Sequence, residues 1–212
     1  MTRALIGLVL GAALVGLCGC ASEPTDSPSR YVRQIQADRA AKDAAFRTES
    51  HSPIPATKRN VLLPLNYYPP DPSYRVPAVL KPDPQNVVIE VPTSTGKPRR
   101  EQVYGTLEFL LKGQTVKLTA FVEEGSVNAD RLFVPFRDPT NGTETYGGGR
   151  YLDLERTPTG LYVIDFNEAY NPYCAYSPTW ECPFPPPENR LPVPIKAGEK
   201  LPKSEIASHG SR

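Results

Sequence analysis

The sequence predicts a mainly β protein, an antiparallel β-sandwich or barrel of about seven or eight short strands with one N-terminal helix and long Pro-rich loops. Two observations favour this fold class. From residue 73 onward, short runs of β-type residues alternate with turn residues. The chain also contains 25 prolines, which are costly inside helices and central strands and therefore favour loops.

The chain begins with the features of an export signal. Arg3 supplies a positive charge, and the uncharged apolar run after it is shorter than the roughly 18 residues of a bilayer span. The stretch Leu17-Cys18-Gly19-Cys20 resembles the lipobox of bacterial lipoproteins, in which a diacylglycerol is attached to the cysteine before cleavage. We predict a signal peptide over 1–19 and a lipid on Cys20; an ordinary secretory signal or an uncleaved anchor is the alternative.

These features predict an exported protein whose partner is the membrane, through the lipid on Cys20. Ala21 follows that cysteine, and in bacteria with two membranes a residue other than Asp there resembles the pattern for sorting to the outer membrane. The small, polar residues 20–29 predict a flexible tether. A single β-rich domain is expected over 30–200, followed by a loose polar tail over 201–212.

The domain is expected to start with one helix, from about Ser27-Pro28 to Thr48, because good helix formers follow a proline suited to the first turn. Its apolar stripe is sparse, which indicates a surface helix. Proline recurs too often over 51–72 for regular structure. The expected strands are 73–80, 86–91, 101–111, 114–123, 131–136, 150–154, 161–166 and 191–195, with a hairpin tip at Lys112-Gly113.

The charge balance disfavours nucleic acid as a partner. Without Arg3 of the leader, 23 basic residues stand against 23 acidic ones, and no segment carries a basic stripe. No cofactor and no metal site are predicted, because the chain has two histidines and no complete calcium-loop or phosphate-loop pattern.

Two stretches, 136–152 and 165–178, are dense in residues that bind ligands. The first ends in three glycines before Arg150, which allows another segment or a ligand to approach closely and offers a cation to an anionic group. A bulged connection between strands and ordinary turn capping are the structural alternatives. The candidate ligand-binding residues are Arg150, Asp165, Asn167, Asn171, Asp138, Glu188, Asn189 and Tyr146.

Cys174 and Cys182 remain once Cys18 is cleaved away and Cys20 carries lipid. In an oxidising compartment, two cysteines eight positions apart are candidates for a disulfide. A zinc site is poorly supported because histidines are scarce.

The final third resembles the DUF1684 family of bacterial proteins of unknown function. The resemblance rests on Thr145-Tyr146, Gly148-Gly149-Arg150-Tyr151-Leu152, Asp165-Phe166-Asn167, Ala169-Tyr170-Asn171-Pro172, Cys174, Cys182-Pro183, Glu188-Asn189 and Ala197-Gly198-Glu199. It covers roughly Tyr31 to Lys200 and matches the short form, without the additional N-terminal portion of longer members. The resemblance implies that the polar cluster belongs together, and it implies no activity.

Three functional hypotheses follow. The first is a lipid-anchored cell-envelope protein that binds a small molecule or cell-wall fragment in a polar pocket, where tyrosines stack on a sugar. The second is an envelope hydrolase that uses Asp165 or Glu188 as acid or base. The third is a structural lipoprotein with no ligand, in which buried Arg150 pairs with Asp165 or Glu188.

Overall fold

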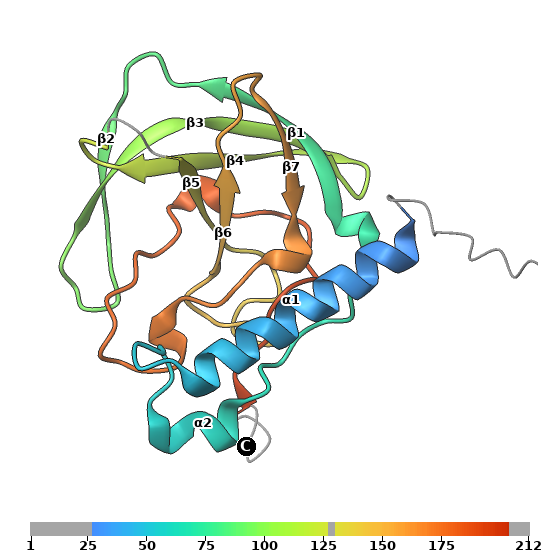
Figure 1. Ribbon diagram of the computed structural model, residues 1–212. Helices are drawn as coiled ribbons and strands as arrows, with labels where there is room; N and C mark the ends of the chain where they lie inside the picture. Colours follow the sequence, from blue (N-terminus) through green and yellow to red (C-terminus); the bar gives the residue numbers. More distant parts are fainter. Residues whose placement is uncertain (1–26, 127–129, 204–212) are drawn as a thin grey trace, which may run out of the picture.

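The computed structural model describes residues 27–126 and 130–203 (Figure 1). The predicted signal peptide, Cys20 and most of the tether lie outside the described residues, as does most of the predicted tail. The strands are β1 (Arg75–Pro82), β2 (Val88–Val91), β3 (Arg99–Leu111), β4 (Gln114–Glu123), β5 (Arg131–Phe136), β6 (Arg150–Glu155) and β7 (Leu161–Asp165). The helices are α1 (Pro28–Thr48) and α2 (Arg59–Leu62), with 3-10 turns η1 (Ala56–Lys58), η2 (Pro72–Tyr74), η3 (Phe166–Glu168), η4 (Tyr173–Ala175) and η5 (Pro187–Asn189).

The seven strands form one antiparallel sheet that curls into a nearly closed barrel. The order is β6-β5-β4-β3-β1-β7, and β2 pairs with β3 off this path. β6 and β7 are consecutive in the chain but stand at opposite ends of this order, where the sheet comes back on itself (Figure 1). The mainly antiparallel β fold and the single long helix are therefore confirmed.

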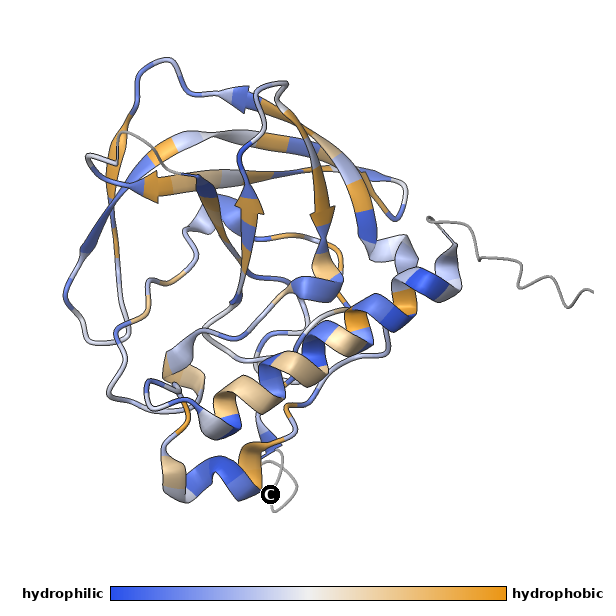
Figure 2. Cartoon of the chain, viewed as in Figure 1, coloured by the Kyte–Doolittle hydropathy of each residue, from blue (hydrophilic) through white to orange (hydrophobic). Residues whose placement is uncertain are grey.

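Strand alternation places the main core inside the curled sheet. Along β4, Val116, Leu118, Ala120 and Val122 are buried and point to the same side, as the two-residue period requires. Figure 2 shows apolar residues recurring along most strands. Burying each such large side chain stabilises the fold by about 1.5–3 kcal/mol.

The hairpin between β3 and β4 has its tip at the predicted residues. The pairing continues to Leu111↔Gln114, and the two residues between, Lys112 and Gly113, have φ angles of 48° and 80°. Positive φ at both central positions is the geometry of the two-residue turn that matches strand twist.

The predicted helix is confirmed as α1. The Ser27 hydroxyl accepts a hydrogen bond from the amide of Arg30 at 3.2 Å, and Pro28 occupies the first turn. Ile35 and Phe46 are its buried residues, which agrees with a sparse apolar stripe. Among the described residues, no helix is long and apolar enough to cross a membrane.

One sequence expectation at the C-terminal end was wrong. Residues 191–195 form no strand, because Pro192 and Pro194 have no amide hydrogen to donate to a ladder, although Leu191 and Ile195 are buried in the core. Leu201, the first residue of the expected loose tail, is 4% exposed and donates its amide to the carbonyl of Glu144. The fixed part of the chain therefore extends past residue 200.

Candidate functional site

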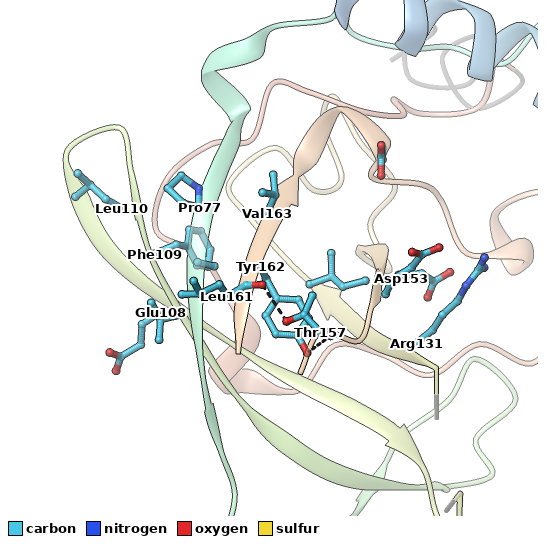
Figure 3. A pocket seen from close by; sticks show the side chains of 15 residues that line it. Pro77, Glu108, Phe109, Leu110, Arg131, Asp153, Thr157, Leu161, Tyr162 and Val163 are labelled. Atoms are coloured by element: carbon cyan, nitrogen blue, oxygen red, sulfur yellow. Dashed lines mark hydrogen bonds between the residues drawn. The ribbon is translucent and has the colours of Figure 1, made fainter. Parts of the chain in front are cut away.

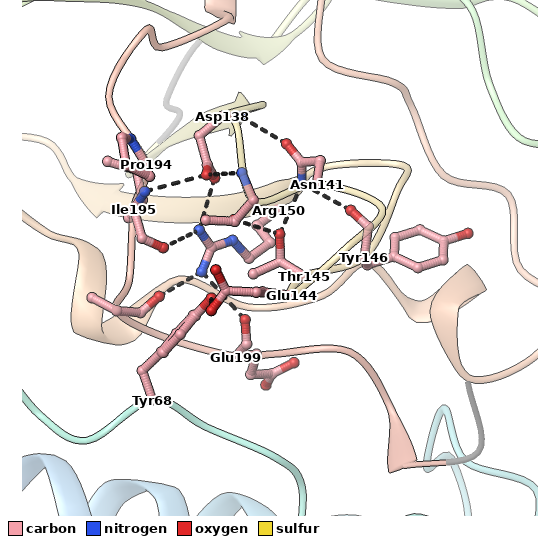
Figure 4. Close-up of polar contacts among 12 residues, drawn as sticks. Tyr68, Asp138, Asn141, Glu144, Thr145, Tyr146, Arg150, Pro194, Ile195 and Glu199 are labelled. Carbon is pink, nitrogen blue, oxygen red and sulfur yellow. Dashed lines mark hydrogen bonds and ion pairs between the residues drawn. The ribbon is translucent and has the colours of Figure 1, made fainter. Parts of the chain in front are cut away.

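Arg150 is the most deeply buried charge among the predicted site residues. It begins β6, and its side chain is fully buried. Its guanidinium donates to Oδ2 of Asp138 and to the carbonyl of Ile195, each at 2.8 Å, and to the carbonyls of Ala197 and Glu199 (Figure 4). A buried cation requires such partners. The hydrogen bonds of Arg150 therefore hold residues 195–199 against β6 of the barrel.

The ion-pair partner of Arg150 differs from the one that the structural hypothesis named. That hypothesis named Asp165 or Glu188, whereas the structure pairs Arg150 with Asp138. Asp138 follows β5, and the register Phe136↔Arg150 brings its carboxylate next to the guanidinium. Glu188 lies exposed on η5.

Gly149 permits the close approach that the glycine run predicts. Its φ is +100°, and a Cβ there would lie 2.8 Å from the carbonyl oxygen of Phe136 and 2.6 Å from the ring of Pro185. Any larger residue would push these segments apart. The prediction of a close approach is confirmed, and the group that approaches is the protein itself.

Asp165 and Asn167 lie together where β7 ends. The Tyr31 hydroxyl lies 2.7 and 2.9 Å from the two carboxylate oxygens of Asp165, and the backbone amide of Asn167 donates to Oδ1 at 2.9 Å. The Asn167 side chain exchanges two hydrogen bonds of 2.8 Å with the backbone of Asp71. These contacts join the first turn of α1 and the segment before β1 to the end of β7.

Asn171 is bound to the C-terminal segment. Its backbone N–H donates to Oε2 of Glu199 at 2.8 Å, and its side-chain Nδ2 donates to the carbonyl of Lys200 at 2.8 Å. Glu199 is 1% exposed and also binds the Tyr176 hydroxyl and, at 2.7 Å, Nζ of Lys42. Glu199 was not predicted as a site residue, although it belongs to the family's Ala-Gly-Glu pattern.

The side chain of Asn189 bridges a gap between β4 and β5. β4 and β5 share one register pair, Phe121↔Phe133. Beyond it, Oδ1 of Asn189 accepts from the amide of Thr119 at 2.7 Å, and Nδ2 donates to the carbonyls of Thr119 and Pro135 at 2.8 and 2.7 Å. The side chain thus takes the place of a strand backbone between the two strands.

Cys174 and Cys182 lie side by side as free thiols. The amide of Cys174 is 3.1 Å from Sγ of Cys182, and the Tyr146 hydroxyl is 3.7 Å from Sγ of Cys174. A hydrogen bond from Cys182 lowers the pKa of the Cys174 thiol to about 7, whereas the pKa of Cys182 is raised. The disulfide stays a prediction.

The predicted site residues therefore occupy several places rather than one pocket. Arg150 lies with Asp138, and Asp165 lies with Asn167, while Asn171, Asn189, Glu188 and Tyr146 lie elsewhere. None of the eight borders the three grooves found among the described residues. Ligand binding by them stays a prediction.

An open groove of about 560 Å³ lies instead on the outer face of β3 to β6. Residues 170–183 and the last turns of α1 form its other wall. Its aromatic lining comes from five segments and includes Phe46, Phe133, Tyr151, Tyr170, Tyr173 and Trp180. We name it the aromatic groove.

The rings of the aromatic groove are held in fixed orientations. Phe133 and Tyr151 meet edge to face with centroids 4.7 Å apart, and Tyr173 and Trp180 do so at 5.2 Å. The backbones of Tyr151 and Tyr170 exchange hydrogen bonds of 2.9 and 3.0 Å, which anchors residues 170–183 to β6. The groove is therefore built by the fold and does not depend on loose side chains.

Charges of both signs border the same groove. Glu101 is 2% exposed and its Oε1 lies 2.8 Å from Nε of Arg99. Burial raises the pKa of Glu101, and the carboxylate of Glu123, opposite it on β4, acts in the same direction. The hydroxyl of Tyr170 donates to Oδ2 of Asp153 at 2.9 Å.

Sequence reasoning missed this groove, but a signal for it is present. Ala120-Phe121-Val122 and the run 132–136 are apolar at consecutive positions. Strands with apolar residues on both faces are covered on both faces. Phe121, which points outward, is accordingly 1% exposed beneath the groove.

The described residues contain no cluster of three or more His, Cys, Asp or Glu side chains with metal-site geometry. The polar groups of the hallmark stretches are instead bound to one another and to backbone. The fold and site define a barrel-like β protein with an internally bonded polar core and an aromatic groove outside its sheet.

The chain belongs to the DUF1684 family of proteins of unknown function, whose model matches residues 63–200. Those residues contain the whole sheet and every hallmark stretch, whereas α1 precedes them.

A solved structure shares this fold. The solution NMR structure of an uncharacterized protein from Haloarcula marismortui is 39% identical, with a TM-score of 0.65, over 81% of this chain and 95% of that one. None of the curated proteins compared with the chain matches it.

Proposed function

We propose that this chain is a lipid-anchored cell-envelope protein that binds a saccharide, of the kind found in cell-wall fragments, in the aromatic groove. The observation that carries the proposal is the groove itself: ordered rings from separate segments converge on one concavity that charged side chains border. The lipid anchor rests on the residues around Cys20.

The chemistry of the lining favours a saccharide over an apolar ligand. Aromatic faces stack on the C–H face of a sugar ring, while carboxylates and guanidinium groups bind its hydroxyls. Glu101, Asp153 and Arg131 offer such groups beside Tyr173 and Trp180. An apolar ligand would leave the buried carboxylate of Glu101 desolvated without a new partner.

A hydrolase with Asp165 or Glu188 as acid or base has weaker support. Both oxygens of Asp165 are bound to Tyr31, and Glu188 is exposed on a turn. Neither residue borders the aromatic groove. We therefore place binding, rather than hydrolysis, first.

The test uses Trp180, the single tryptophan of the chain, as a reporter at the groove. Soluble peptidoglycan fragments and N-acetylglucosamine oligomers are titrated while its fluorescence is recorded. We expect a saturable change in fluorescence. Tyr173→Ala should weaken the affinity about 5- to 150-fold, because about 1–3 kcal/mol of stacking and burial is lost.

Val87→Ala is the matched control. Val87 is 41% exposed against 40% for Tyr173, and it lies outside the groove. This variant should bind as the wild type does. No saturable change with any fragment, together with a protein mass unaltered by them in native mass spectrometry, would refute the proposal.

A further inference from the structure

Five apolar side chains stand exposed on the outer face of three neighbouring strands. Val79, Leu110, Leu161 and Val163 are 50%, 60%, 62% and 47% exposed, and Pro77 lies among them (Figure 3). We name these five residues the apolar face.

Strand register makes these residues one continuous patch. Pro77 pairs with Val163 and Val79 pairs with Leu161 across β1 and β7, and Leu110 stands on β3 beside them. They border an open groove of about 1080 Å³ where the two ends of the sheet meet. Contiguous exposed apolar residues on a sheet mark an interaction surface.

The described chain begins beside this patch. Tyr31, in the first turn of α1, binds Asp165, which follows Val163 by two positions on the same strand face. The guanidinium of Arg75 lies 5.9 Å from the centre of the Tyr31 ring. Ser27 is thus close to the apolar face.

The proposed lipid site is within reach of the same place. Six residues lie between Cys20 and Ser27, and the seven residue steps from one to the other span at most about 25 Å in a fully extended chain. A lipid on Cys20 would therefore keep this end of the domain, rather than the far end of α1, near the bilayer.

The rim of the patch carries basic side chains. Arg75 and Lys81 stand on β1, Lys112 at the hairpin tip, and Lys117 on β4, with side-chain exposures of 53%, 64% and 61% for Arg75, Lys81 and Lys117. The nearby carboxylate of Glu108 is shared by Lys81 and Lys117 at 2.5 and 2.7 Å. Acidic side chains balance these cations, because Glu108, Asp153, Glu155 and Glu168 line the groove that the apolar face borders, together with Arg131. A contact at this face therefore depends on the aliphatic side chains and on the place where the chain enters the domain.

We propose that the apolar face rests on the lipid surface to which the chain is anchored. This inference rests on the lipid anchor of the proposed function. Membrane attachment strengthens when two membrane-binding elements combine. Here the two elements are the acyl chains on Cys20 and a shallow contact by the aliphatic side chains of the apolar face.

The contact would orient the aromatic groove. α1 has 21 residues, about 30 Å of helix, and begins beside the apolar face. Lys42 and Phe46, near its other end, line the aromatic groove. Arg131 and Asp153 line both the aromatic groove and the groove beside the apolar face, so the two grooves adjoin. The membrane contact therefore places the α1 side of the aromatic groove farther from the bilayer than the apolar face.

The test places a fluorescent reporter on the face of the full-length lipidated protein. Trp180→Phe removes the native tryptophan, and Leu110→Trp adds a new one to the patch. The protein is reconstituted in phosphatidylcholine–phosphatidylglycerol vesicles with brominated acyl chains, which quench nearby indoles. We expect the Leu110→Trp protein to lose most of its emission and to shift to shorter wavelength.

Val61→Trp in the same background is the matched control. Val61 is 59% exposed, against 60% for Leu110, but lies on α2, which packs near the far end of α1. It should stay unquenched. Adding Val163→Glu to the Leu110→Trp protein should restore emission, because a carboxylate on the face is costly to remove from water at the lipid contact.

Equal quenching at both positions, or none at either on vesicle-bound protein, would overturn the inference. The absence of quenching at both positions would indicate that the apolar face binds a protein partner instead of lipid. The mass of the purified protein shows whether Cys20 carries lipid. Fragment binding to the protein with its native tryptophan shows whether the aromatic groove binds a saccharide. A failed membrane contact is thereby distinguished from a failed anchor or a failed binding site.

Discussion

Single residues at the centre of this fold combine polarity with complete burial. The guanidinium of Arg150 is bound, in place of water, by one carboxylate and three carbonyl groups. The carboxylate belongs to Asp138 and the carbonyl groups to residues 195–199, and no strand ladder joins these two segments. The net gain from such a buried pair is small, but the loss of one partner is large, because the other charge stays in the core. This asymmetry predicts that the loss of Arg150 alone destabilises the fold.

Arg150→Ala should therefore destabilise the domain by about 3–5 kcal/mol, because Asp138 is left as a buried, unpaired carboxylate. Urea unfolding followed by circular dichroism measures this change. Arg131→Ala, which removes a guanidinium from an outward position on β5, should unfold near the wild-type midpoint. A folded Arg150→Ala protein of wild-type stability that has lost ligand binding would instead favour the original pocket hypothesis.

At the scale of elements, the sheet is held in part by side chains that act as backbone. Asn189 offers one acceptor and two donors to the edges of β4 and β5, where their ladder ends after Phe121↔Phe133. A single turn, η5, positions that side chain. The seven strands form one sheet because a loop residue spans the place where two of them separate.

Asn189→Ala should cost about 2–3 kcal/mol, since three buried hydrogen bonds are lost and the backbone groups of Thr119 are left without partners. Thermal unfolding quantifies the loss. Glu188→Ala, the neighbouring exposed residue on the same turn, is the control and should leave the midpoint unchanged. Equal effects of the two substitutions would show that the turn, and not the amide, matters.

Most elements could be predicted from local pattern. The helix start was marked by Ser27-Pro28, and the hairpin by Lys112-Gly113 between alternating strands, because capping and turn chemistry are local. The strand predicted over 191–195 was wrong. Its alternating apolar residues suit a buried strand, but its prolines cannot donate the backbone hydrogen bonds of a strand ladder.

The arrangement of the candidate site was less predictable. The sequence marked Arg150, Asp165 and Asn189 as polar and unusual, but the identity of a partner depends on register between distant segments. Asp138 faces Arg150 only because β5 and β6 pair as Phe136↔Arg150. The aromatic groove draws Lys42 and Trp180 from segments more than a hundred residues apart, so no local pattern defines it.

At the scale of the whole molecule, two surfaces of different chemistry lie toward opposite ends of α1. The aromatic groove gathers rings and charges near the end of the helix, and the apolar face stands near its start. The two grooves also adjoin, since Arg131 and Asp153 line both of them. This arrangement agrees with the proposed attachment beside the start of α1 and the proposed ligand site toward its end.

Cys20→Ser should release the protein from membranes without changing its fold, because the core contacts described above are made among residues within 27–203. Fractionation of membranes and soluble extract measures the release. The domain should keep its circular dichroism spectrum and its fragment binding. Persistent membrane association of this variant would contradict lipidation at that cysteine.

The segment 190–201 has a consequence for how the chain is made. It supplies Leu191, Ile195 and Ala197 to the core, and it carries the carbonyl groups and the carboxylate that bind Arg150 and Asn171. These residues are the last of the domain to leave the ribosome. Until they arrive, Arg150 and Asn171 lack the partners that this segment supplies, so we expect the domain to become compact only after residue 201 is made. Late folding of this kind agrees with the export that we propose for this chain, because a polypeptide crosses a translocation channel before it becomes compact.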